Sequence, residues 1–185
     1  MITIVSGLPR SGTSLMMQML AAGGMTLLTD RERQPDIDNP RGYWEWEPIK
    51  LLPKQPHLID QAEGKAVKVI SQLLLSVPKG HVYKLIFMER PLPEVLASQD
   101  EMLKRRRSSQ SVDPALLTAA FRGHLKEIVA WLEEREDIPV CRVGYRKLVS
   151  DPADCARTVR DFLDVDLNVE AMAGQVDSSL YRNRR

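Results

Sequence analysis

The segment at residues 7–14 constrains the fold of this chain more than any other. It reads Gly-Leu-Pro-Arg-Ser-Gly-Thr-Ser and separates two segments of different character. Residues 2–5 are all β-branched and mostly apolar, which is typical of a buried parallel strand. Residues 13–22 are good helix formers, and Gly23 and Gly24 end that run. A strand, a glycine-containing turn and a helix in this order predict the opening unit of an α/β domain.

The rest of the chain repeats the alternation of strands and helices. Further strands are expected at residues 66–70, 82–88 and 138–143. Helices are expected at residues 43–52, 91–107, 113–136 and 151–163, and residues 24–44 form a long loop. This order predicts a three-layer α/β/α fold of the P-loop nucleotide-binding type, with a central parallel sheet, in a single domain covering residues 1–185.

Composition excludes several classes of protein. The 185 residues are 43% hydrophobic and 28% charged, which suits one soluble domain. A net charge of +1 gives no reason to expect nucleic acid as a partner, and no apolar run is long enough to span a membrane. The N-terminus lacks the features of a secretory signal, and the two cysteines suit reduced thiols, so we expect a cytoplasmic protein.

The opening loop, residues 7–14, has the chemistry of an anion site. Amide groups at the start of a helix attract phosphate oxygens, and glycines allow the ligand to approach the backbone. Arg10 adds a planar set of donors, and Thr13 and Ser14 add hydroxyl groups. The spacing resembles the nucleotide-binding pattern G-x4-G-K-[ST], but Thr13 replaces the lysine, which argues against ordinary NTP hydrolysis. The alternative is a tight turn that only joins strand to helix.

A second candidate anion site follows the strand expected at residues 82–88. Arg90 comes directly after that strand, at the edge of a parallel sheet where ligands usually bind. Ser98 follows eight residues later, about two turns into the next helix. Together they would hold a phosphate, whereas the alternative for Arg90 is a surface salt bridge.

Taken together, these segments resemble the sulfotransferase family. Residues 9–14 match that family's 5′-phosphosulfate loop, P-[KR]-S-G-T-[TS], in which threonine replaces the lysine of the nucleotide-binding pattern. Arg90 and Ser98 match its 3′-phosphate signature. Residues 39–45 resemble an N-P-x-G-[YF]-x-E segment of bacterial members, and residues 143–163 resemble the family's Y-x-x-L, D-P and F-L region.

The resemblance implies an enzyme that transfers a sulfuryl group from 3′-phosphoadenylyl sulfate to a hydroxyl or amine, without a metal ion. Arg10 would be catalytic, because it stands where the family carries its catalytic lysine or arginine. Arg90 and Ser98 would hold the 3′-phosphate. The 5′-phosphosulfate would be held by the remaining matched residues, which are Pro9, Arg10, Ser11, Gly12, Thr13 and Ser14.

The transfer also needs a base for the acceptor's proton. Glu45 is the first choice because it follows the N-P-x-G turn, and the alternatives are Asp30, Glu47 and the three histidines. Lys68 is expected to be solvated, and the alternative is a contact with the sulfate or the donor. The aromatic residues 43, 44 and 46 would line an acceptor pocket or pack in the core. The arginines at 105–107 would attract an anionic acceptor, extend the 3′-phosphate site, or only favour the helix end.

Two other functions stay open. The first is a small P-loop nucleotide kinase, and the second is a non-catalytic nucleotide-binding module. The chain is shorter than typical animal cytosolic sulfotransferases and lacks their C-terminal R-K-G-x-x-G-x-W-K loop, although residues 180–185 are basic. The sequence identifies neither the acceptor nor the oligomeric state.

Overall fold

A computed structural model describes residues 1–30, 32–105 and 113–181 of the chain. Its centre is a sheet of five strands, all parallel, in the order β2-β3-β1-β4-β5. The strands are β1 (Ile2–Gly7), β2 (Leu27–Leu28), β3 (Ala66–Lys68), β4 (Tyr83–Glu89) and β5 (Val140–Gly144). The predicted α/β class and parallel sheet are therefore confirmed. Because β1 lies between β3 and β4, the strand order reverses beside it, and ligands bind at such reversals in many open α/β sheets.

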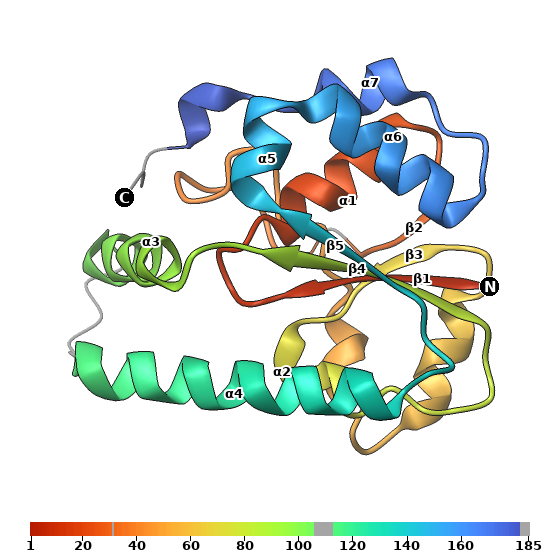
Figure 1. The fold of residues 1–185 in the computed structure, drawn as a ribbon, viewed down its shortest axis with the longest axis horizontal. Coiled ribbons are helices and arrows are strands. Elements are labelled where there is room, and N and C mark those ends of the chain that lie inside the picture. Colours follow the sequence, from red (N-terminus) through yellow and green to blue (C-terminus); the bar gives the residue numbers. More distant parts are fainter. Residues whose placement is uncertain (31, 106–112, 182–185) are drawn as a thin grey trace.

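Helices cover both faces of the sheet (Figure 1). One face carries α1 (Thr13–Ala22), α5 (Tyr145–Ser150), α6 (Pro152–Leu163) and α7 (Val169–Ala173). The other carries α2 (Ser71–Leu74), α4 (Pro114–Glu134) and the 3₁₀ helices η1 (Glu47–Leu51) and η2 (Pro56–Ala62). Two cores result, because successive side chains of a strand point to opposite faces: Ile4 packs in one and Val5 in the other.

The remaining helices lie at the ends of the sheet. Helix α3 (Leu92–Arg105) follows β4 and lies beyond the carboxyl ends of the strands (Figure 1). The short helix η3 (Ser178–Leu180) precedes the C-terminus near the same edge. The last two residues of the helix predicted at 91–107 lie outside the described residues. Among the described helices, none combines the length and the apolar character that a membrane span requires.

The helix predicted at residues 43–52 is wrong over its first half. Residues 43–46 are irregular, and only η1 is helical, as a 3₁₀ helix. The backbone carbonyl groups of this segment are bonded elsewhere. The carbonyl of Tyr43 accepts from Ser14 and Lys68, and that of Glu45 accepts from Thr29 and the amide of Asp30. These tertiary bonds replace the bonds that a helix would make within itself.

Both cysteines lie in the core on the α6 face of the sheet. Cys141 belongs to β5 and Cys155 to α6, and both are buried free thiols. Burial raises the pKa of each thiol above its ordinary value, because the thiolate would lose its hydration. Their environment is that of small packing residues.

Candidate functional site: an anion cleft beside the first helix

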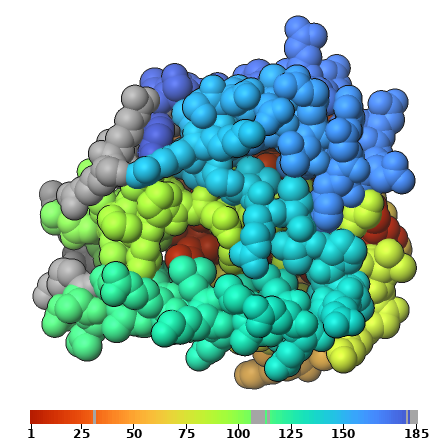
Figure 2. All heavy atoms as spheres, viewed as in Figure 1, coloured from red at the N-terminus to blue at the C-terminus, as the bar shows by residue number. Residues whose placement is uncertain are grey.

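A cleft of about 440 Å³ opens at the carboxyl edge of the sheet. It is bordered by the opening loop, by the ends of β3 and β4, and by the segment between β2 and η1, which includes Arg33 and Glu45. Of the described residues, seven basic and four acidic side chains line it, so its electrostatic character favours an anion. Figure 2 shows a hollow between α3 and α4 on one face of the molecule, but no described residue of α4 is among those that line the cleft.

Two glycines give the opening loop its shape. Gly12 has a φ of 103°, and a Cβ there would lie 2.6 Å from a ring carbon of Tyr145. Gly7 has a φ of 152°, and a Cβ there would lie 2.6 Å from the carbonyl oxygen of Met88. Arg10 adopts a φ of 68°, which is uncommon for a residue with a side chain. The loop therefore holds a conformation that ordinary residues at positions 7 and 12 would disrupt.

Several amide groups at the start of α1 have no acceptor among the residues that the structure describes. Gly12 precedes the helix, provides no side-chain cap, and the first turn contains no acidic residue. Ser11 donates its amide to the carbonyl of Leu8. Within the described part of the chain, no acceptor is bonded to the amides of Arg10, Gly12, Thr13, Ser14 and Leu15. All five residues line the cleft, so the helix dipole and these donors favour an anion there.

Arg10 connects the opening loop to the second predicted anion site. Its Nε donates to Ser98 Oγ over 3.0 Å, and its Nη2 donates to the carbonyl of Asp38 over 3.1 Å. Burial lowers the pKa of the Arg10 guanidinium, and the nearby Asp38 carboxylate partly offsets this. The two segments that the sequence predicted separately therefore meet in one cleft.

Arg90 has a buried side chain, and its salt bridge is therefore not the surface salt bridge that was the alternative. Its side chain is only 7% exposed, and its Nε donates to the buried carboxylate of Glu94 over 3.0 Å. Its Nη1 donates to the carbonyl of Arg10 over 3.0 Å, and its guanidinium lies over the ring of Tyr145. Arg90 lines the cleft, but these contacts also make it a support of the opening loop.

The hydroxyl groups of the opening loop differ in their surroundings. Ser14 Oγ donates to the carbonyl of Tyr43 and accepts from Asn39 Nδ2 and Lys68 Nζ. Ser11 does not line the cleft: it is 1% exposed, and its Oγ has no partner among the described residues. Thr13 lines the cleft but is only 8% exposed. The loop therefore presents amides and Arg10 to the cleft more than it presents hydroxyl groups.

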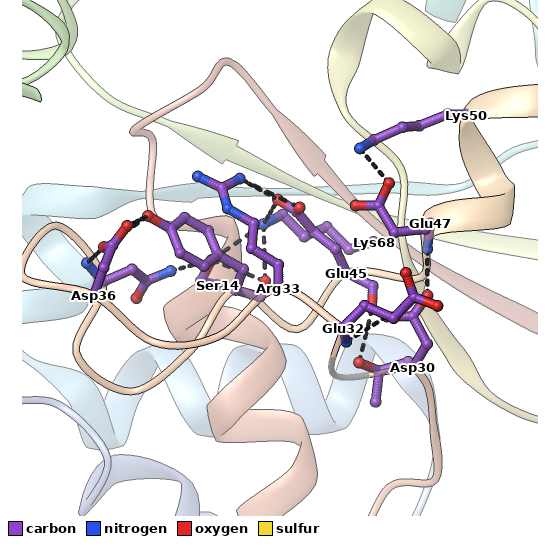
Figure 3. Close-up of polar contacts among 12 residues, drawn as sticks. Ser14, Asp30, Glu32, Arg33, Asp36, Glu45, Glu47, Lys50 and Lys68 are labelled. Carbon is purple, nitrogen blue, oxygen red and sulfur yellow. Dashed lines mark hydrogen bonds and ion pairs between the residues drawn. The ribbon is translucent and has the colours of Figure 1, made fainter. Parts of the chain in front are cut away.

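Lys68 is buried at the end of β3, whereas we expected it to be solvated. Its side chain is 6% exposed, and its Nζ donates to Ser14 Oγ, the Tyr43 carbonyl and Glu45 Oε1 at 3.0–3.1 Å (Figure 3). Burial lowers the pKa of Lys68, and the Glu45 carboxylate opposes this. The sequence indicated this location only by placing Lys68 at the carboxyl end of an apolar strand, where ligand sites of parallel sheets lie.

Glu45 is the one predicted base candidate that lines the cleft, among the residues described. Its carboxylate is 18% exposed and is paired with Lys68 at 3.1 Å and with Arg33 at 3.3 Å. Asp30 instead accepts from the amides of Glu32 and Glu47, and Glu47 pairs with Lys50 (Figure 3). None of the three histidines lines the cleft.

The aromatic residues and the basic segments have separate positions. Tyr43 and Trp46 line the cleft and are buried, whereas Trp44 packs against the core on the α6 face. Arg105 lines the cleft and pairs with Asp38. The other two residues of the basic run at 105–107 lie outside the described residues, as do residues 182–185 of the basic tail. In the described ranges, no group of three potential ligands for a metal ion occurs.

No protein-family model matches this chain, and no curated protein sequence matches it. The resemblance to sulfotransferases therefore stays a prediction, and the geometry of the cleft carries the proposal that follows.

Proposed function

We propose that this chain is a sulfotransferase with a P-loop type of nucleotide site, which transfers a sulfuryl group from 3′-phosphoadenylyl sulfate to a hydroxyl or amine. One observation carries the proposal. The hydrogen bond from Arg10 to Ser98, 88 positions apart in the chain, joins the two segments that resemble the family's phosphate sites. Both segments line one cleft with an excess of basic side chains. A ligand with two separated phosphates would bind such a surface.

The amides at the start of α1 that have no acceptor in the described part of the chain are best suited to the 5′-phosphosulfate. Gly12, Thr13 and Ser14 would donate these amides, and Arg10 would supply positive charge beside them. Ser98 accepts from Arg10 and keeps its own hydroxyl proton for the 3′-phosphate. Arg90 would add positive charge from beneath the surface of the cleft, because most of its side chain is buried.

Transfer would then proceed in line. The acceptor oxygen or nitrogen forms a bond to sulfur while the bond from sulfur to the bridging phosphate oxygen breaks. The negative charge that develops on this oxygen leaves with adenosine 3′,5′-bisphosphate, and Arg10 would stabilise it. The acceptor's proton would pass to the carboxylate of Glu45, which Lys68 and Arg33 hold at the cleft.

Binding and transfer are tested separately. Calorimetry with adenosine 3′,5′-bisphosphate, ATP and 5′-AMP should show the tightest binding for the bisphosphate. Tighter binding of ATP would instead support the small nucleotide kinase. Transfer from donor labelled on sulfur, to a panel of alcohols, phenols and amines, should yield labelled product. Bisphosphate binding without transfer to any acceptor would favour the non-catalytic module.

The proton acceptor is tested with a pair of matched variants. Glu45→Gln keeps the size of the side chain but cannot take a proton, so turnover should fall by about 10²–10⁴-fold with nucleotide affinity retained. Glu47→Gln is the control, because Glu47 lies on the same segment but does not line the cleft. Full activity of Glu45→Gln would move the base elsewhere.

A further inference from the structure

Glu94 is a buried carboxylate that the cleft does not contain. It lies in the first turn of α3 and is 0% exposed. Its oxygens accept from Arg90 Nε at 3.0 Å, from Arg146 Nε at 2.6 Å and from the Tyr181 hydroxyl at 2.9 Å. Burial by itself would raise the pKa of Glu94, but these hydrogen bonds lower it below its ordinary value, so the group is ionised. A buried carboxylate with three donors holds the side chains of these donors in fixed positions.

A chain of contacts leads from Glu94 to the anion cleft. Glu94 holds the Nε end of Arg90, and the Nη1 of Arg90 donates to the carbonyl of Arg10. The rings of Tyr145 and Tyr181 lie 4.5 Å and 5.4 Å from the Arg90 guanidinium carbon and fix its plane. The end of this chain is therefore the backbone of the opening loop.

The residue at the end of the chain is the one that needs support. Arg10 has a φ of 68°, a left-handed conformation that is unfavourable for a residue with a Cβ. The same residue directs its guanidinium to Ser98 and to the carbonyl of Asp38. Loss of the bond to its carbonyl would let the backbone relax and would move both the guanidinium and the amides that follow.

We propose that Glu94 is a positioning residue for the anion site, which acts through Arg90 to hold the Arg10 backbone in its left-handed conformation. The nucleotide named as ligand rests on the proposed function, whereas the positioning itself does not. A purely structural role would join α3 to α5 and the C-terminal segment without changing the opening loop. The two roles therefore differ in what happens at Arg10.

Nuclear magnetic resonance of the ligand-free protein distinguishes these roles. The Nε–H signals of Arg10 and Arg90 report the bonds to Ser98 and Glu94, and Glu94→Gln should shift both of them. Arg135 is an internal control, because it is buried and donates its Nε to its near neighbour Asp137, and both residues are more than 40 positions after Glu94 in the chain. An unchanged Arg10 signal, with Arg90 shifted, would overturn the proposal.

A double-mutant cycle tests the same coupling through the ligand. Glu94→Gln should weaken binding of adenosine 3′,5′-bisphosphate by about tenfold, a loss of 1.4 kcal/mol. In an Arg10→Gly background the same change should cost less than about threefold, because glycine adopts positive φ without support. Equal costs in both backgrounds would contradict the positioning role. Glu89→Gln is the matched control, since Glu89 pairs with the exposed Arg142.

The outcomes separate this proposal from the proposed function. If the wild-type protein does not bind the bisphosphate but the Arg10 signal moves in Glu94→Gln, the function fails and the positioning role stands. If Glu94→Gln does not fold, Tyr181→Phe and Arg146→Gln each remove one donor from a carboxylate that keeps two others. Both should then shift the Arg10 signal, and no shift in either variant would refute the proposal.

Discussion

The N-termini of α1 and α6 are built in opposite ways, although both helices cover the same face of the sheet. The N-terminus of helix α6 has a side-chain cap: the Asp151 side chain accepts from the amide of Asp154, and Asp154 adds negative charge to the first turn. Helix α1 begins after Gly12 with neither a side-chain cap nor an acidic residue. Helices α4 and α7 resemble α6, since Asp113 and Asn168 cap them.

The N-terminus of α1 is therefore less stabilised by its own residues than the N-terminus of α6. A side-chain cap contributes about 0.5–2 kcal/mol, and an acidic first turn adds to it. The α1 terminus lacks both and faces a cleft with an excess of basic side chains. Removal of a side chain that faces the cleft at the start of α1 should therefore change ligand binding and catalysis more than stability, and removal of the α6 cap should do the reverse.

The largest expected effect is on catalysis, at the uncapped start of α1. Arg10→Ala should lower sulfuryl transfer by about 10²–10³-fold, because one preorganised donor to the developing charge is lost. Turnover with labelled donor measures this change, and thermal unfolding should show a fold that is nearly as stable as the wild type. Transfer at the wild-type rate would remove Arg10 from the catalytic role.

The next effect concerns the shape of the opening loop. Gly12→Ala places a Cβ 2.6 Å from the Tyr145 ring at a φ of 103°. We expect a cost of about 1–3 kcal/mol, which appears both in the free energy of unfolding and in the bisphosphate affinity. Gly123→Ala in α4 is the control, because a Cβ there meets open space. Equal behaviour of the two variants would show that the loop tolerates a side chain.

A smaller effect, on stability alone, is expected at the capped start of α6. Asp151→Ala removes the α6 cap and should reduce the free energy of unfolding by about 1 kcal/mol. For a chain of this size the melting temperature should fall by about 2–4 °C. Bisphosphate affinity should be unchanged, because Asp151 does not line the cleft. A loss of affinity would mean that the two helix ends are coupled.

The smallest effect should appear in the pH dependence of stability. Hydrogen bonds keep the pKa of Glu94 below its ordinary value of 4.5, so this group stabilises the fold above that pH and loses the contribution as pH falls through the folded value. Tyr181→Phe removes one of the three donors and should raise the folded pKa. The variant should be less stable at neutral pH, and denaturant titrations should show the difference vanishing in acid. A difference that is constant with pH would exclude Glu94 as its cause.

Local signals in the sequence accounted for most of the fold. The apolar run of β4, the helix starts expected at residues 113 and 151 and the turn after β1 each predicted an element that the structure contains. The short elements were missed. Strand β2 has two residues, and α5 follows β5 directly after Gly144 without a side-chain cap. Elements of this kind are defined by their neighbours and leave little pattern in the sequence.

The candidate site was predicted in its parts but not in its connections. Arg10, Arg90, Ser98 and Glu45 all line the cleft. Glu94 lies four residues after Arg90, on the same side of the helix start, yet nothing in its sequence position indicates that it is buried. A charged residue in a helix is usually exposed, so only the packing of α3 against α5 and the C-terminal segment reveals its partners.

The sequence by itself determined the alternation of strands and helices and the glycine turn before α1, because these depend on neighbouring residues and on hydrophobic period. Only the tertiary structure decided that Lys68 is buried, that residues 43–46 are irregular and that Arg10 meets Ser98. Such features arise from contacts between residues far apart in the chain. The burial of a charge is decided by donors that distant elements bring to it, and no local pattern records that.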